Sequence, residues 1–291
     1  MAKNSKSSYP SSSSGSIFKK LLFLVVIGLL IAGGFWAVEE RPELSQYVAD
    51  FGQKETTTQT FELVFPPETI MQLRKKELLR SAEHSFGTSY VQFSPLLLLH
   101  VKYTPNQKQT EEADCLWDQS TAEMILDTST FETTHGFEDC INAQASDEDF
   151  LILHALSKHS GSMNKDALAV ELGIDSETLT GRLNSLRKKH LIVQKLDTVT
   201  LHFQTPLLKV VPKTKIVQRF VDKQIQKEAR LAAKYSKSQI QKLAQDAFGA
   251  DFAIRSSREV YVPIVVVVVQ NPDGSQLKTL FNGVTGKRIG V

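Results

Sequence analysis

The two cysteines, Cys115 and Cys140, are the side chains of this sequence best suited to redox chemistry. Two cysteines are too few to build a disulfide-rich scaffold. In an oxidising compartment they could form one bridge, and closing a loop of about 25 residues would stabilise the fold by roughly 3–4 kcal/mol in the chain-entropy model. In a reducing compartment they would pack as small buried apolar groups. Both interpretations stay open, and we favour the bridge.

The histidines and acidic residues form no established catalytic or metal-binding pattern. His154 and His159 lie five positions apart and lack the glutamate of a zinc-binding helix. His135 and Cys140 would suit a thiol nucleophile with its base, but two residues of the right type are weak evidence for one. The Glu138-Asp139 pair has no calcium-loop spacing, and the chain has no Gly-x-Ser-x-Gly elbow, phosphate loop or dinucleotide fingerprint. We therefore expect no enzyme, no cofactor and no metal.

Charge is distributed very unevenly along the chain, although the formal net charge is only +2. From Glu111 to Asp149 there are twelve Asp and Glu and no Lys or Arg, a charge of −12. From Thr178 to Lys242 there are fifteen Lys and Arg and three acidic residues, a charge of +12. Two stretches of opposite sign are expected to attract each other, rather than to form one nucleic-acid surface.

The apolar segment from Leu21 to Val38 carries no charged residue and, at ~1.5 Å per residue, covers ~27 Å of hydrocarbon. Lys19-Lys20 precede it, Glu39-Glu40 follow it, and Trp36 lies where an interfacial aromatic residue belongs. A cleaved signal peptide is the main alternative, but the apolar stretch is longer than a signal core and its cleavage site is poor. We predict one retained transmembrane helix that contacts membrane lipid.

The charges that flank this segment predict its orientation. Residues 1–20 contain four lysines and no acidic residue, whereas residues 39–50 contain four acidic residues and one arginine. The positive-inside rule then leaves the N-terminus in the cytoplasm and carries residues 39–291 across the cytoplasmic membrane.

Residues 146–206 show the clearest local pattern, which is three short amphipathic helices followed by two β runs. Asp147 or Ser146, Asn164 and Asp175 are the predicted N-caps of the helices. Leu191 to Lys195 and Val199 to Phe203 then read as two β runs joined at Leu196-Asp197-Thr198. This order resembles a winged-helix domain.

The winged-helix resemblance implies a third helix that could read DNA in the major groove. The same cationic side chains also suit the solvated C-terminal end of a helix, where they interact favourably with its dipole. Because the predicted topology places this helix outside the cytoplasm, we expect a protein-interaction face rather than a DNA face. The candidate residues are Arg182, Arg187, Lys188 and Lys189.

The C-terminal residues predict a helix, a strongly β-branched strand, a tight turn and a returning strand. This pattern resembles the small bacterial PepSY-type module, and Ala244, Tyr261, Asp273-Gly274 and Thr285-Gly286 carry the resemblance. Asn282 stands where the family pattern would have an acidic residue. The resemblance implies an extracytoplasmic module that binds or restrains peptidases.

We therefore predict an α+β multi-domain protein with a single N-terminal transmembrane helix. We expect a bacterial envelope protein that presents an extracytoplasmic protein-interaction or scaffolding surface to other envelope proteins. The alternative is a membrane-tethered winged-helix DNA-binding regulator with its bulk in the cytoplasm, and a hydrolase comes third. The predicted parts are a disordered cytoplasmic leader (1–20), a transmembrane helix (21–38), a spacer (39–60), an acidic α+β region (61–145), a winged-helix-like domain (146–206), a basic helix (207–235) and a small α+β module with a helix and a β-hairpin (236–291).

Overall fold

The structure is a computed structural model, and it describes residues 57–104, 109–203 and 205–290. The predicted spanning segment, Leu21 to Val38, lies outside the described residues, as do the leader and most of the spacer. Within the described part, none of the helices is both long and apolar enough to cross a membrane. Residues Thr57–Val291 cluster as one compact unit.

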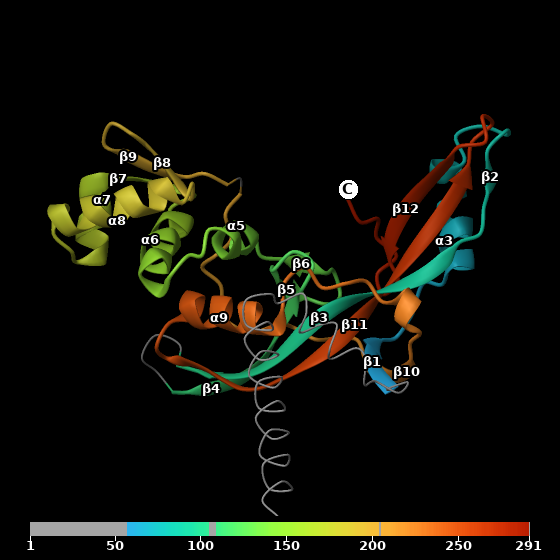
Figure 1. Ribbon diagram of the computed structural model, residues 1–291, viewed down its shortest axis with the longest axis horizontal. Helices are drawn as coiled ribbons and strands as arrows, with labels where there is room; N and C mark the ends of the chain where they lie inside the picture. The colour runs from blue at the N-terminus through green and yellow to red at the C-terminus, as the bar shows by residue number, and fades with distance from the viewer. Residues whose placement is uncertain (1–56, 105–108, 204, 291) are drawn as a thin grey trace, which may run out of the picture. The chain divides into compact units, whose positions relative to one another are not determined.

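Two long antiparallel strands, β3 (Tyr90–Tyr103) and β11 (Phe252–Gln270), run side by side through this unit (Figure 1). Each contains an unbroken apolar run, Leu96–Leu99 in β3 and Val265–Val269 in β11, and every residue of both runs is buried. A strand that is covered on both faces needs no alternation of polar and apolar residues. The β-branched valines also favour the extended backbone.

The remaining strands extend this pair into a sheet of nine strands among the described residues. The order is β10-β1-β11-β3-β4-β5-β6, and β12 and β2 also pair with β11. β1 is parallel to β11, while the other pairings are antiparallel. The bounds are β1 (Thr57–Phe61), β2 (Ser85–Phe86), β4 (Glu111–Asp118), β5 (Met124–Asp127), β6 (Glu132–Thr133), β10 (Phe220–Gln224) and β12 (Gln276–Asn282).

The β11–β12 hairpin forms at the turn that the sequence predicts. The carboxylate of Asp273 accepts hydrogen bonds from the backbone N–H (2.9 Å) and the hydroxyl (2.6 Å) of Ser275. Gly274 has a φ of +83°, in the left-handed region that glycine adopts without steric cost. The predicted strand, turn and returning strand are therefore confirmed as local structure.

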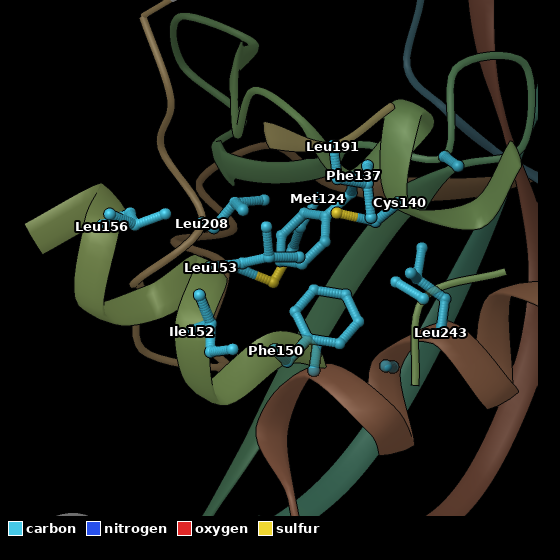
Figure 2. Close-up of a cluster of buried hydrophobic side chains, with 14 of the residues drawn as sticks. Met124, Phe137, Cys140, Phe150, Ile152, Leu153, Leu156, Leu191, Leu208 and Leu243 are labelled. Atoms are coloured by element: carbon cyan, nitrogen blue, oxygen red, sulfur yellow. The ribbon is translucent and has the colours of Figure 1, made fainter. Parts of the chain in front are cut away.

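Helices α5 (Phe137–Asn142), α6 (Asp147–Lys158) and α9 (Lys237–Phe248) contribute to the largest hydrophobic cluster, together with residues on one face of β3. Figure 2 shows Phe137 and Phe150 inside this cluster, near Cys140. A second cluster forms where α3 (Pro67–Leu73) and α4 (Lys75–Leu78) meet alternate valines of β11. Side chains at alternate positions share one face of a strand, so both helices bury the same row.

Residues 146–201 contain α6, β7 (Ser162–Asn164), α7 (Lys165–Leu172), α8 (Ser176–Lys188), β8 (Ile192–Lys195) and β9 (Thr198–Leu201). The three strands form a small sheet in the order β7-β9-β8. The helix starts agree with the predicted caps, since the side chains of Ser146, Asn164 and Asp175 each accept a hydrogen bond from a backbone N–H of the first turn.

The fold class predicted from the sequence, an α+β multi-domain chain, is wrong. The described residues form a mixed α/β fold with one large sheet and seven α-helices. Strand β3 of the predicted acidic region pairs with β11 of the predicted C-terminal module. Helix α6 of the predicted winged-helix-like domain shares one hydrophobic cluster with β3 and α9. Local periodicity reveals helices and hairpins, but the pairing of strands distant in sequence leaves no such signal.

The predicted basic helix over residues 207–235 is also wrong, because most of this segment has no regular secondary structure and the rest includes β10 and a short 3-10 turn, η2 (Lys227–Ala229). Thr214 explains part of the difference. Its backbone N–H donates to the carbonyl of Asp114 (2.8 Å), and its hydroxyl donates to the carbonyl of Ile125 (2.6 Å) and accepts from the N–H of Leu116 (2.8 Å). These bonds tie Thr214 to both β4 and β5, and its backbone N–H, which a helix would use internally, is bonded to β4 instead.

The expected attraction between the acidic and basic stretches is confirmed by ion pairs. Lys215, Lys234 and Lys189 lie 2.6–2.9 Å from carboxylates of the acidic stretch, and Arg182 lies 3.7 Å from one. Such pairs are worth little when fully exposed, but they position the segments that carry them. The acidic partners are Asp127, Glu138, Asp149 and Glu148, respectively.

The turn between β8 and β9 carries a strained and exposed leucine, and this gives a first prediction. Leu196 has a φ of +52° and its side chain is 93% exposed. Replacing Leu196 with Gly should raise the free energy of unfolding by about 0.5–1 kcal/mol, because a Cβ atom is disfavoured at positive φ. Urea denaturation of the full chain measures the change.

The control is Leu196→Ala, which removes the leucine side chain but keeps the Cβ atom. It should leave the free energy of unfolding within a few tenths of a kcal/mol of the parent value. A glycine variant no more stable than the alanine variant would show that backbone strain is not the cause.

Candidate functional site

A pocket of about 680 Å³ opens on the face of the large sheet opposite the main hydrophobic cluster. Its floor is apolar and includes Leu96 of β3, Ile125 of β5 and Ile264 of β11. Its wall is acidic, and among the described residues of its lining the basic side chain is His135, with no Lys or Arg. We call it the acid-walled pocket, after the carboxylates of Asp118, Glu123, Glu138 and Asp139.

Glu123 holds the wall together through hydrogen bonds to the segment before α5. Its carboxylate accepts from the backbone N–H groups of Gly136 (2.9 Å) and Glu138 (3.0 Å) and from the hydroxyl of Thr134 (2.6 Å). Burial raises the pKa of Glu123, although these three donors favour the charged form and oppose that rise. The side chain therefore fixes the start of α5 against the sheet at a cost in desolvation.

The residue before α5 is Gly136, and its position could not hold a larger residue. Its φ is +113°, and a Cβ atom there would lie 2.5 Å from the ring of Phe203. Both the backbone conformation and the close approach require glycine. The bond from its N–H to Glu123 therefore depends on a residue with no side chain.

Asp118, at the end of β4, lies beside the apolar floor. Its carboxylate accepts a hydrogen bond from the backbone N–H of Ser120 (2.7 Å). Burial raises its pKa, and the nearby carboxylate of Glu138 adds to the rise. The pKa of Asp139 is also raised, first by burial and then by Glu138. The charge of Glu138 thus disfavours ionisation of both Asp118 and Asp139, while His202 lowers the pKa of Asp139 and opposes the effect there, so a bound cation would favour the ionised carboxylates.

Glu138 is the wall carboxylate that has a partner cation. It accepts from the ammonium group of Lys234 (2.6 Å) and the hydroxyl of Tyr235 (3.2 Å). The hydrogen bond to Glu138 is the main reason why the pKa of Lys234 is raised to about 12. Asp118, Glu123 and Asp139 have no ion pair within the described residues.

The sequence-predicted cysteine bridge is not formed, because both cysteines are free and buried. Cys115 lies on β4 and donates its S–H to the carbonyl of Pro212 (2.6 Å), whereas Cys140 lies on α5 inside the main cluster. Burial raises the pKa of each thiol. The two pack as small apolar groups, and Cys140 is a poor candidate for a nucleophile paired with His135.

The four cationic residues proposed as an interaction face lie on or just after α8, but two of them are engaged within the molecule. Arg182 pairs with Glu148 at 3.7 Å, and Lys189 pairs with the buried Asp149 at 2.6 Å. Arg187 and Lys188 are exposed. The structure thus leaves only half of the predicted set available to a partner.

Sequence reasoning missed the acid-walled pocket, although it noted the acidic stretch and the Glu138-Asp139 pair. The unneutralised charge of residues 111–149 was the available signal. Within the described residues, no group of three or more His, Cys, Asp or Glu side chains could hold a metal ion. The four carboxylates of the wall are related only in that they line one pocket with an apolar floor.

Comparisons with known proteins add no assignment. No protein-family model, no curated protein and no solved structure matches the chain. Its function must therefore be inferred from the chemistry of its own residues.

The raised pKa of Glu123 predicts a pH-dependent stability. A raised carboxyl pKa means that the folded state binds the proton more tightly, so this contribution is present below about pH 4.5 and is lost as the pH rises through the folded pKa. Replacing Glu123 with Gln keeps an acceptor for α5 and removes the titration. The stability of the variant relative to the parent should increase from pH 4.5 to pH 7.5 in urea denaturation of the full chain.

Asp273→Asn is the control of opposite sign, because hydrogen bonds from Ser275 lower the pKa of Asp273. A lowered carboxyl pKa gives stability above the unfolded value that is lost as the pH falls. The stability of this variant relative to the parent should therefore increase as the pH falls. A Glu123→Gln difference that stays constant or shrinks with rising pH would contradict the prediction.

Proposed function

We propose that the chain is a binding protein that captures a cationic, amphipathic segment of a partner protein in the acid-walled pocket. The observation that carries the proposal is a wall of four carboxylates above an apolar floor, with no Lys or Arg in the lining. Like charges that are partly desolvated are costly to keep ionised. A Lys or Arg side chain of the partner would supply the missing counter-charge.

The floor defines the rest of the ligand. Val262, Ile264 and Leu280 line it, so an aliphatic side chain beside the cation would remove apolar surface from water. Pockets that bind specifically combine an apolar lining with a few placed polar groups. Charge complementarity adds specificity and speeds association more than it adds affinity. The role proposed is binding without catalysis.

The sequence supports a location for this binding at the outer side of the cytoplasmic membrane. Leu21 to Val38 would anchor the chain in the cytoplasmic membrane, with the N-terminus inside and the bulk outside, and the partners would be envelope proteins. The four lysines before the segment and the acidic residues after it support that orientation. A short tether of this kind would hold the pocket near other membrane-bound chains and raise their effective concentration.

The ligand preference can be tested with a defined peptide of alternating lysine and leucine. The full chain, in nanodiscs of uncharged lipid, should bind this peptide with an affinity that falls as salt is raised. Asp118→Asn combined with Asp139→Asn should weaken binding about tenfold, since each removes one wall charge. Isothermal titration calorimetry measures the effect.

The matched control is Asp166→Asn combined with Glu177→Gln, which removes the same charge from exposed sites on α7 and α8 outside the pocket. It should leave the affinity unchanged. Equal losses in the two double variants would show that the peptide senses net charge and not the pocket.

The predicted topology gives a separate test. A reporter fused after Val291 should be active when it is alkaline phosphatase, which requires export, and inactive when it folds only in the cytoplasm. The reverse pattern would place the bulk of the chain in the cytoplasm and overturn the envelope assignment, leaving the pocket's ligand chemistry to be judged by the peptide experiment.

A further inference from the structure

A second pocket, of about 540 Å³, lies beside the main hydrophobic cluster, between α6, the end of α9 and the segment 209–212. Phe150, Phe248 and Phe252 line it, and all three rings belong to the aromatic network of the core. Leu151 on α6 and Val211 in the segment 209–212 also line it, yet they are 55% and 56% exposed. We call this the α6–α9 groove.

The groove has an acidic rim. Four carboxylates and one lysine, Lys209, belong to its lining. Two of the carboxylates have cationic partners within the chain, Glu148 with Arg182 and Asp246 with Lys242. The other two are Asp147, the first residue of α6, and Asp251, which follows α9, and neither has an ion pair among the described residues. The groove is thus apolar inside and negative at its edge.

The turn between β8 and β9 has the complementary properties. Leu196 is the most exposed of the large hydrophobic side chains in the described part of the chain, at 93%, and it is held there at positive φ. Lys195 precedes it, and the backbone N–H of Lys165 donates to the carbonyl of Asp197 (2.7 Å), which brings a second lysine residue to the turn. A residue that is both strained and exposed is a candidate for function rather than stability.

We infer that the α6–α9 groove receives the β8–β9 turn of a second copy of this chain, with Leu196 inside the groove and the lysines near its acidic rim. Transfer of an exposed leucine into an apolar groove removes apolar surface from water and favours association, but association has its own entropic cost. The contact is weak by itself, and anchoring two copies in one membrane would strengthen it.

The geometry of this contact has a consequence. The turn and the groove are different surfaces, so each copy would offer one of each and the contact is of the head-to-tail type. Such contacts close into rings or continue as chains. A copy that keeps only the turn and a copy that keeps only the groove should still form a single pair.

Disulfide crosslinking in membranes tests the inference directly. Two full-length versions with different tags would be produced together, one with Leu196→Cys and the other with Val211→Cys. Mild oxidation should give a dimer that contains both tags. A single chain with both substitutions should instead give a ladder of dimers, trimers and larger species. Cys115 and Cys140 are buried, and the parent chain should give no band.

The matched control pairs Leu196→Cys with Val170→Cys, because Val170 is 82% exposed on α7 and lies outside the groove. Its dimer yield should be several-fold lower than that of the Val211 pair. Equal yields for both pairs, or no mixed dimer with Val211→Cys while the chains are folded by thermal melting, would overturn the inference. The acid-walled pocket is untouched by these substitutions, so peptide binding there is an independent readout.

Discussion

The pairing of β3 with β11 is the constraint on which the rest of the structure depends. These strands come from opposite ends of the described chain, and their register aligns Phe252 with Tyr103 and Pro263 with Phe93. One face of the pair carries the main hydrophobic cluster, and the other provides floor residues of the acid-walled pocket. Because a strand's side chains alternate between faces, a shift of one residue would exchange the two sets. The site exists only in this register.

Glu123 connects the sheet to helix α5. It lies just before β5, and its carboxylate holds the backbone of residues 134–138 ahead of and within α5. Glu138 then extends the link to Lys234 and Tyr235 in the segment that leads to α9. A buried carboxylate with three donors is costly to desolvate, yet removing it would leave those donors unpaired. The same interaction therefore organises the fold and shapes the wall of the pocket.

The local features could be predicted from the sequence because their causes are local. The caps at Ser146, Asn164 and Asp175 are short-range hydrogen bonds, and the Asp273-Gly274 turn needs only two neighbouring residues. The arrangement could not be predicted, because it depends on pairings across long separations in the sequence. The segment 207–235 shows the conflict most clearly. Its apolar spacing suits a helix, but the backbone N–H of Thr214 bonds to β4 and residues Phe220–Gln224 pair with β1 as a strand.

The candidate sites were hidden for a related reason. Opposite charges in the two stretches were visible in the sequence, and their attraction was expected, but the sequence could not show which charges would remain unpaired. Four of the twelve acidic residues between Glu111 and Asp149 form ion pairs with the basic stretch.

Among the rest, Asp118, Glu123 and Asp139 line the same pocket, where Glu123 is buried, Asp118 is partly buried and Asp139 is exposed. The basic stretch from Thr178 to Lys242 contains fifteen Lys and Arg. Among the described residues, none of them forms an ion pair with these three carboxylates. Glu123 is satisfied by three hydrogen-bond donors, whereas the partly buried Asp118 has no ion pair among the described residues, and an unpaired charge of this kind lowers stability. A counter-charge supplied by a partner would relieve this cost, and that is the role that the proposed function gives to the cationic segment.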